Sequence, residues 1–271
     1  MVEPNEGVME ASAVVERLKE FGRTRGDSDW SALDKETETL VRRNPFAFLV
    51  AVAFDRGMPW EKAWRIPTEI DRRGLLDPVR LAAMNEAELA MLLDGVAVRP
   101  RWSTKQGAKT LSDAARLVAG RFAGDAEAIW KDSSPAAVQK TFQEIRGIGP
   151  GIASMATRIL RDDFGCFRGQ EGEIDVKPDE HLVRVFVRAG LSDGYSDNEV
   201  MHAARRLNPE FPGELDWPAW RIGQVWCHPT RPDCGGCPLT EVREAVMSLI
   251  AMFVSAFDHA SCYRRSNGPS S

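Results

Sequence analysis

Apolar residues recur three and four positions apart along most of the chain, which is the spacing that places them on one face of an α-helix. The segments with this pattern are 14–18, 40–54, 81–93, 111–122, 138–145, 152–160 and 181–187. Proline and glycine separate these segments, and no run of alternating polar and apolar residues is long enough to indicate a sheet. The pattern predicts an all-α protein built of many short helices.

The composition is that of an ordinary globular protein: of 271 residues, 43% are hydrophobic and 28% are charged. The longest apolar run, from Phe46 to Phe54, is well short of the roughly 20 residues that cross a bilayer. The acidic and polar N-terminal residues do not resemble a signal peptide. We therefore expect no membrane partner, a monomer, and a cytoplasmic location, at the nucleoid if the protein is bacterial.

The net charge of −5 argues mildly against a nucleic-acid partner when it is taken alone. The basic residues are nevertheless grouped: 99–109, 158 and 161, 184 and 188, 205 and 206. A solvated helix face explains any one of these groups. They indicate phosphate contacts only if an independent motif calls for such contacts.

Three glycines and a proline stand close together in the segment 144–153, which reads EIRGIGPGIA. We expect a helix to end at Ile145, Gly147 and Gly149 to form a tight turn with positive φ, and Pro150 to begin the next helix. Such a turn exposes backbone N–H groups at a helix N-terminus, which suits phosphate binding. Taken alone, the glycines favour a plain connection between two helices.

A carboxylate and a group of cysteines follow. Asp179 stands at the start of an amphipathic segment, where a simple N-cap role explains it when it is viewed alone. Cys227, Cys234 and Cys237 have the spacing Cys-x6-Cys-x2-Cys. Thiolates at such spacing are soft ligands for an iron–sulfur cluster or zinc, so these three predict a metal site in a reducing compartment.

In this order, the three features resemble the helix-hairpin-helix DNA glycosylases of the endonuclease III-like group, over roughly residues 40 to 242. The family carries a glycine hairpin, an aspartate followed two residues later by histidine, and a Cys-x6-Cys-x2-Cys-x5-Cys loop. Asp179 and His181 match the second feature. The resemblance implies two helical domains with an active-site cleft between them. The expected parts are a six-helix domain, 44–161, with the hairpin 145–153; a second domain, 1–43 and 162–242, with the catalytic aspartate and the cysteine loop 227–237; and a divergent C-terminal helix and tail, 243–271.

The resemblance also implies an activity: a DNA glycosylase of base-excision repair, which binds double-stranded DNA and hydrolyses the N-glycosidic bond of a flipped damaged, mispaired or modified base. Asp179 would stabilise the positive charge that develops on the sugar. Amides at Gly147, Gly149 and Gly151 would hold a phosphate. Arg56 would fill the gap left by the flipped base, although a solvated charge at a helix end explains this residue equally well.

The chain departs from the family in its possible nucleophile and near its aspartate. Bifunctional members carry a catalytic lysine two residues after the second hairpin glycine, where this chain has Gly151. The resemblance therefore implies a monofunctional enzyme, and the motif gives no reason to assign Lys177 as the catalytic lysine. The segment 167–176 is longer than usual and contains a second carboxylate, Asp175. We prefer Asp179, because only it has a histidine two residues later.

The cysteine loop departs as well, because the fourth cysteine position is occupied by Arg243. Apolar residues from Val242 to Phe257 predict a continuous helix over 239–257, about 27 Å long, which leaves Cys262 too few residues to reach back. A four-iron, four-sulfur cluster would thus have three of its four cysteines, and it would be completed by another ligand, labile or lost. Zinc is the less favoured metal.

Two other functions remain open at this point. The first is a non-catalytic DNA-binding protein of the same fold, because helix-hairpin-helix units also serve as plain phosphate-binding modules. The second is a metal-dependent interaction protein that acts through its cysteine loop. The sequence does not identify the excised base.

Overall fold

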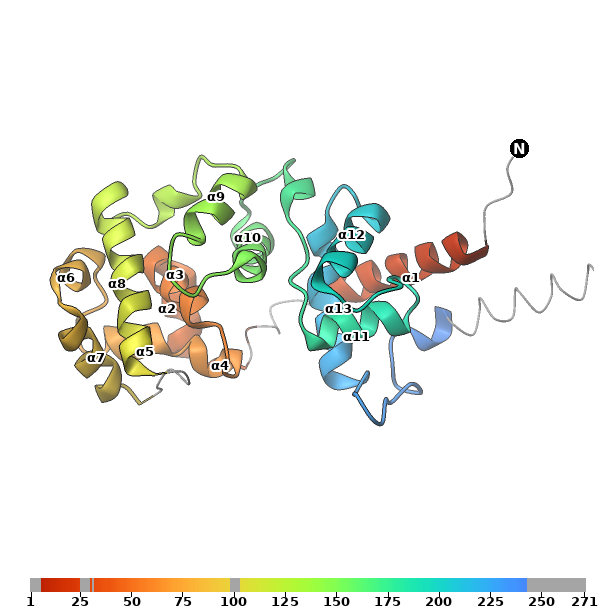
Figure 1. Cartoon of the computed structure of the whole chain (residues 1–271), viewed down its shortest axis with the longest axis horizontal. Coiled ribbons are helices and arrows are strands. Elements are labelled where there is room, and N and C mark those ends of the chain that lie inside the picture. Colours follow the sequence, from red (N-terminus) through yellow and green to blue (C-terminus); the bar gives the residue numbers. More distant parts are fainter. Residues whose placement is uncertain (1–5, 25–29, 31, 98–102, 243–271) are drawn as a thin grey trace, which may run out of the picture. The chain divides into compact units, whose positions relative to one another are not determined.

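The computed structural model describes residues 6–24, 30, 32–97 and 103–242 (Figure 1). All the regular secondary structure assigned within these residues is helical. The all-α prediction is confirmed. The helices are α1 (Glu6–Arg23), α2 (Lys35–Arg43), α3 (Pro45–Phe54), α4 (Trp60–Ala63), α5 (Ile66–Asp71), α6 (Pro78–Ala83), α7 (Glu86–Gly95), α8 (Thr104–Arg121), η2 (Glu127–Ile129), α9 (Pro135–Phe142), α10 (Pro150–Phe164), η3 (Glu171–Glu173), α11 (Glu180–Arg188), α12 (Asp197–Leu207), η4 (Pro212–Leu215) and α13 (Asp216–Val225).

The chain divides into two compact units. Unit 1 contains residues 1–24, 178–208 and 217–271, and unit 2 contains residues 25–177 and 209–216. Of the described residues, 30, 32–43, 162–177 and 209–216 thus belong to the same unit as the hairpin, whereas the resemblance placed them in the other domain. Packing explains the difference, because α2 contacts α3 and α5. In addition, the Trp30 indole N–H donates to Asp163 at 3.0 Å.

Unit 2 is built around α3, whose side chains from Phe46 to Phe54 are all buried. Asn44 begins this helix, because its side-chain oxygen accepts the N–H groups of Phe46 and Ala47 at 2.9 and 3.1 Å. Helix α3 packs against α2, α5, α8 and α10, while α8 lies along α6 and α7 (Figure 1). The apolar segment is therefore a core helix, and its C-terminal end sets the position of Asp55 and Arg56.

Unit 1 contains α1, α11, α12 and α13. Helix α11 buries Leu182, Val185 and Phe186, and its charged residues are Glu180, Arg184 and Arg188, which confirms its amphipathic pattern. Helix α13 approaches α11 closely at Gly223, where an added Cβ would lie 2.6 Å from the backbone oxygen of His181. A residue with no side chain is therefore needed at this contact.

The helix before the hairpin ends earlier than the sequence pattern suggests, because α9 stops at Phe142 and not at Ile145. The chain then tightens: the Ile145 N–H donates to the Phe142 oxygen, three residues back, at 3.0 Å. This turn carries Ile145 into the core, where it is 1% exposed. The apolar spacing therefore continues past the helix end, which is why periodicity alone misplaced it.

The described residues end at Val242. The helix expected over 239–257 therefore falls largely outside them, and the divergent segment 243–271 falls wholly outside them. Within the residues that the structure describes, no helix has both the length and the hydropathy of a membrane span.

Candidate functional site

The hairpin turn joins α9 to α10 and depends on a left-handed glycine. Gly147 has φ +102°, a conformation that side chains disfavour, so the expected positive φ is confirmed there. Gly149 has φ −88° and ψ 176°, so the same expectation is wrong for this residue. Ile145 and Ile148, both buried, anchor the two sides of the turn, and the Ile148 N–H donates to the Ile145 oxygen at 3.0 Å.

Helix α8 holds the backbone of this turn at Arg146. The Thr110 hydroxyl donates to the Arg146 carbonyl oxygen at 2.9 Å, and the Arg146 N–H donates to a carboxylate oxygen of Asp113 at 3.2 Å. Because α8 is a long helix packed in the core, these two contacts fix the turn on a rigid support. Sequence reasoning missed both residues, since nothing in their local pattern sets them apart from other polar positions on a helix.

Arg56 lies beneath the turn, in the space where a side chain on Gly147 would project. One guanidinium nitrogen of Arg56 donates to the Thr110 hydroxyl at 3.2 Å. Burial lowers the pKa of Arg56. The residue expected to enter the DNA stack thus packs against the hairpin in this structure, and Gly147 is doubly constrained, by its φ and by this guanidinium.

The first turn of α10 carries no side-chain cap. Gly149 occupies the N-cap position and makes no side-chain hydrogen bond, and Pro150 follows in the first turn. Among the described residues, no atom lies within 4 Å of where a Cβ on Gly149 would be. The backbone N–H groups at this end are therefore not taken by a capping side chain, as phosphate binding requires.

Gly151 and Lys177 meet although they are far apart in sequence. A Cβ on residue 151 would lie 3.3 Å from Cγ of Lys177, so the lysine stem passes over the first turn of α10. The Lys177 ammonium donates to Met155 Sδ at 3.3 Å and lies 3.9 Å from a carboxylate oxygen of Asp55. Lys177, to which the family motif gives no role, thus lies beside position 151.

The backbone of Lys177 is fixed as well, because its N–H donates to the carboxylate of Asp216. The other oxygen of Asp216 lies 3.3 Å from Nε of Arg158, and both side chains are less than 10% exposed. Arg158, on α10, also pairs with Asp162 at 3.1 Å. A buried charge network therefore joins α10 to the chain at residue 177. Sequence reasoning missed Asp216, whose partners come from distant segments.

Asp179 is the N-cap of α11 in unit 1. Its Oδ1 accepts the N–H groups of His181 and Leu182, both at 2.9 Å. These amides stabilise a negative charge and fix the plane of the carboxylate. Asp175, the second carboxylate considered, begins no helix, and its backbone oxygen accepts the Ser154 hydroxyl at 2.9 Å. Of these two carboxylates, only Asp179 caps a helix.

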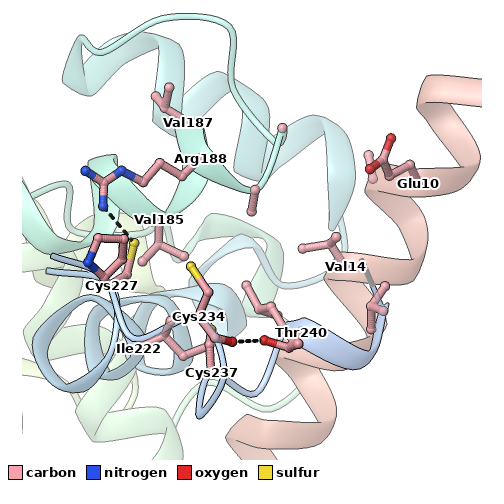
Figure 2. Close-up of a pocket in the computed structure, with 16 residues that line it drawn as sticks. Glu10, Val14, Val185, Val187, Arg188, Ile222, Cys227, Cys234, Cys237 and Thr240 are labelled. Atoms are coloured by element: carbon pink, nitrogen blue, oxygen red, sulfur yellow. Dashed lines mark hydrogen bonds between the residues drawn. The ribbon is translucent and has the colours of Figure 1, made fainter. Parts of the chain in front are cut away.

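The three expected metal ligands, Cys227, Cys234 and Cys237, line one cavity of about 670 Å³ in unit 1 (Figure 2). An Arg188 guanidinium nitrogen lies 3.5 Å from Cys227 Sγ and also donates to the His228 carbonyl oxygen at 2.7 Å. Burial raises the pKa of the Cys237 thiol. Arg188 thus places a cationic donor beside one of the three sulfurs.

Cys227, Cys234 and Cys237 are sulfur donors of the kind that hold iron–sulfur clusters or zinc. They line one cavity, so the chemistry of the donor set fits such a group at three positions. Within the described part of the chain, no three acidic, histidine or cysteine side chains are arranged to hold a metal ion. Arg243 and Cys262 lie outside the described residues. Cys166 belongs to unit 2 and packs against its core.

Comparisons with known proteins identify solved structures of similar fold but no protein that is similar in sequence. No family model and no curated protein matches the chain. A structure of a trapped covalent intermediate of endonuclease III with DNA aligns with a TM-score of 0.59 at 17% identity, over 86% of this chain and 94% of that one. A non-covalent endonuclease III–DNA complex aligns with a TM-score of 0.58 at 18% identity, over 86% and 94%.

A third solved structure, of a thermostable thymine-DNA glycosylase, aligns with a TM-score of 0.56 at 16% identity, over 86% of this chain and 95% of that one. The alignments span nearly the whole of each of the three proteins. The chain therefore has the fold of endonuclease III and thymine-DNA glycosylase.

Proposed function

We propose that this chain, with its endonuclease III-like fold, is a monofunctional DNA glycosylase that hydrolyses the N-glycosidic bond of a flipped damaged, mispaired or modified base. The observation that carries the proposal is Asp179, a carboxylate held by two backbone amides at 2.9 Å on a fold shared with DNA glycosylases. The substrate is double-stranded DNA, and the enzyme acts as a monomer in the cytoplasm, at the nucleoid if the protein is bacterial.

Base release makes the sugar positive and the departing base negative. Because both amide donors use Oδ1 of Asp179, the second oxygen of the fixed carboxylate is the one that would face the sugar. There it stabilises the developing cation and orients the attacking water. The base leaves the stack beforehand, since the bond is inaccessible within a duplex.

The proposal excludes a lyase step from the hairpin. The endonuclease III neighbour forms a covalent intermediate with DNA, and such an intermediate requires a nucleophile on the protein. Gly151 offers no amine at the position where the resemblance places one. The expected product is therefore an intact strand that carries an abasic site.

The hairpin and Arg56 would bind the DNA around that base. Amides at Gly147, Gly149 and Gly151 contact a phosphate without reading sequence. Arg56 fills the space that the flipped base leaves in the duplex. To do so, it gives up its hydrogen bond with Thr110 and contacts the DNA instead. Insertion of Arg56 would therefore also release one support of the hairpin.

Cys227, Cys234 and Cys237 would hold an iron–sulfur cluster at three corners. When bound, such a group supplies a structural tie for the loop 227–237 and takes no part in base release. Arg188, 3.5 Å from Cys227 Sγ, donates to the sulfur and offsets its negative charge. Zinc is the less favoured metal.

The second candidate function is a non-catalytic DNA-binding protein of the same fold. The observation in its favour is that Asp179 already has a structural task as the N-cap of α11. A third function, a metal-dependent interaction protein, would need the cysteine loop but neither Asp179 nor DNA.

The decisive experiment measures base release from duplexes that each contain one damaged, mispaired or modified base. Strands are analysed with and without hot alkali, for the wild type, Asp179→Asn and Asp175→Asn. Asparagine is as good an N-cap as aspartate, so Asp179→Asn removes the charge and keeps the cap. Asp175→Asn is the matched control.

Cleavage only after alkali, lost in Asp179→Asn and kept in Asp175→Asn, is the expected result. Cleavage without alkali would contradict the monofunctional proposal. DNA binding that is equal in the wild type and Asp179→Asn, with no product from any duplex, would favour the non-catalytic function. Partner binding that depends on metal but not on DNA would favour the third.

A further inference from the structure

The ammonium of Lys177 has more donor capacity than its contacts within the described residues use. Among the described residues, its partners are Met155 Sδ, which is a weak acceptor, and one carboxylate oxygen of Asp55 at 3.9 Å. The Lys177 side chain is 26% exposed, against 10% for Asp55. Since an ammonium has three donors, a further anion can bind it without displacing Asp55.

The rest of Lys177 is held rigidly within unit 2. Asp216 accepts its backbone N–H and pairs in turn with Arg158 on α10. The absence of a side chain at Gly151 leaves room for the lysine stem along the same helix. An ordinary surface lysine loses considerable side-chain entropy when it binds a ligand, and a stem that is already fixed loses less. Lys177 is therefore preorganised to present a positive charge.

The covalent chain keeps residue 177 close to the proposed catalytic residue, Asp179. Only Pro178 separates Lys177 from Asp179, so the Cα atoms of these two residues lie within about 7.6 Å of each other. Any nucleotide that Asp179 engages therefore lies near the backbone of residue 177, within a few residues' reach of its side chain, and the nearest anions of a DNA substrate are the phosphates on either side of that nucleotide.

We propose that Lys177 binds a DNA phosphate that flanks the excised nucleotide. The inference rests on the proposed function, because DNA supplies the anion and Asp179 locates the nucleotide. Lys177 contributes charge and not a nucleophile. Gly151 and Lys177 then act as a pair: the missing side chain at one position makes room for the cation from the other.

The test is the salt dependence of DNA binding, measured with a duplex that contains one tetrahydrofuran abasic-site analogue and so cannot be turned over. Lys177→Gln and Lys177→Met remove the charge and keep most of the stem, whereas Lys177→Arg keeps the charge. Lys35→Gln is the matched control, since it removes another lysine of unit 2 that pairs with a carboxylate, Glu38, at 3.8 Å.

We expect the slope of log affinity against log salt to become shallower by about one in Lys177→Gln and Lys177→Met, the loss of one phosphate contact. Lys177→Arg and Lys35→Gln should keep the wild-type slope. Thermal unfolding of each variant identifies any that is not folded, and the other neutral variant then decides.

An unchanged slope in the neutral variants overturns the inference. So does weaker binding with an unchanged slope that arginine does not restore, which is the signature of a structural role. If the wild type excises a base but the slopes are equal, the glycosylase proposal stands and this inference fails. If the wild type neither binds the duplex nor excises any base, both fail.

Discussion

The guanidinium of Arg56 occupies the space into which a side chain on Gly147 would project. The two residues are distant in sequence, yet they share this space, so a side chain on residue 147 would require the Arg56 guanidinium to move. The left-handed φ of Gly147, +102°, adds a second reason for glycine.

Gly147→Ala should therefore destabilise the protein by about 1–3 kcal/mol, from backbone strain and displacement of Arg56. Gly149→Ala is the matched control, because Gly149 has φ −88° and no described atom within 4 Å of the added Cβ. Its cost should be clearly smaller. Urea unfolding of the two variants gives the comparison, and equal losses would contradict the assignment of Gly147.

Arg56 should matter most where a base is hardest to flip. Arg56→Ala should slow base release from a fully paired duplex more than from one in which the same base is mispaired, because unpaired bases leave the stack more easily. Single-turnover rates on the two duplexes measure the ratio. Thr110→Val tests the alternative: it removes the hydroxyl contact with Arg56 and the Arg146 oxygen but leaves the guanidinium.

If Arg56 acts only by supporting the hairpin, Arg56→Ala and Thr110→Val should lower the rates on both duplexes alike. A ratio that changes only in Arg56→Ala supports insertion into the stack.

Asp179 should show separable roles in stability and activity. Asp179→Ala removes the oxygen that accepts the His181 and Leu182 N–H groups and should cost about 1 kcal/mol of stability, whereas Asp179→Asn should cost less. Both should lower the rate of base release, by about 10²–10³-fold, through the lost charge. Unfolding and single-turnover measurements on the same preparations check both. Activity that tracks stability, with Asp179→Asn fully active, would leave only the capping role.

Asp216 should be among the most sensitive positions in unit 2. Asp216→Ala removes one of the two carboxylates that pair with the buried Arg158, leaving Asp162, and also removes the acceptor of the Lys177 N–H. Complete loss of the partner of a buried charge costs about 3–5 kcal/mol, and the remaining pair with Asp162 offsets part of this cost. Glu36→Ala is the control, because its pair with Arg72 is exposed and contributes little to stability. A loss in Asp216→Ala as small as in the control would mean that the buried pair is not formed.

The three cysteines should determine the iron and sulfide content of the protein. Protein purified without oxygen should carry both, and Cys227→Ser, Cys234→Ser and Cys237→Ser should each lower them, because each thiol lines the same cavity. Cys166→Ser should not, since that thiol lies in unit 2. Iron and sulfide assays with visible absorption measure the content. Zinc in place of iron, or no metal in the wild type, would contradict the proposed cluster.

The features set by near neighbours in sequence were predictable from it. Apolar spacing predicted an all-α fold because each helix must bury one face. The left-handed turn at Gly147 and the position of Asp179 at the start of a helix follow from local backbone sterics and capping. The same local signals failed at Ile145, where apolar spacing continues past the last residue of α9, and at Gly149, which needs no left-handed conformation.

Contacts between distant segments were decided only by the tertiary structure. Nothing near Lys177 in the sequence shows that its stem lies over Gly151, or that its N–H reaches Asp216. Nor does the sequence near Arg56 place it under Gly147. Local sequence determines which helices form and where they are capped, because those energies depend on residues a few positions apart. The partners of a long side chain depend on how the helices pack, and that is a property of the whole core.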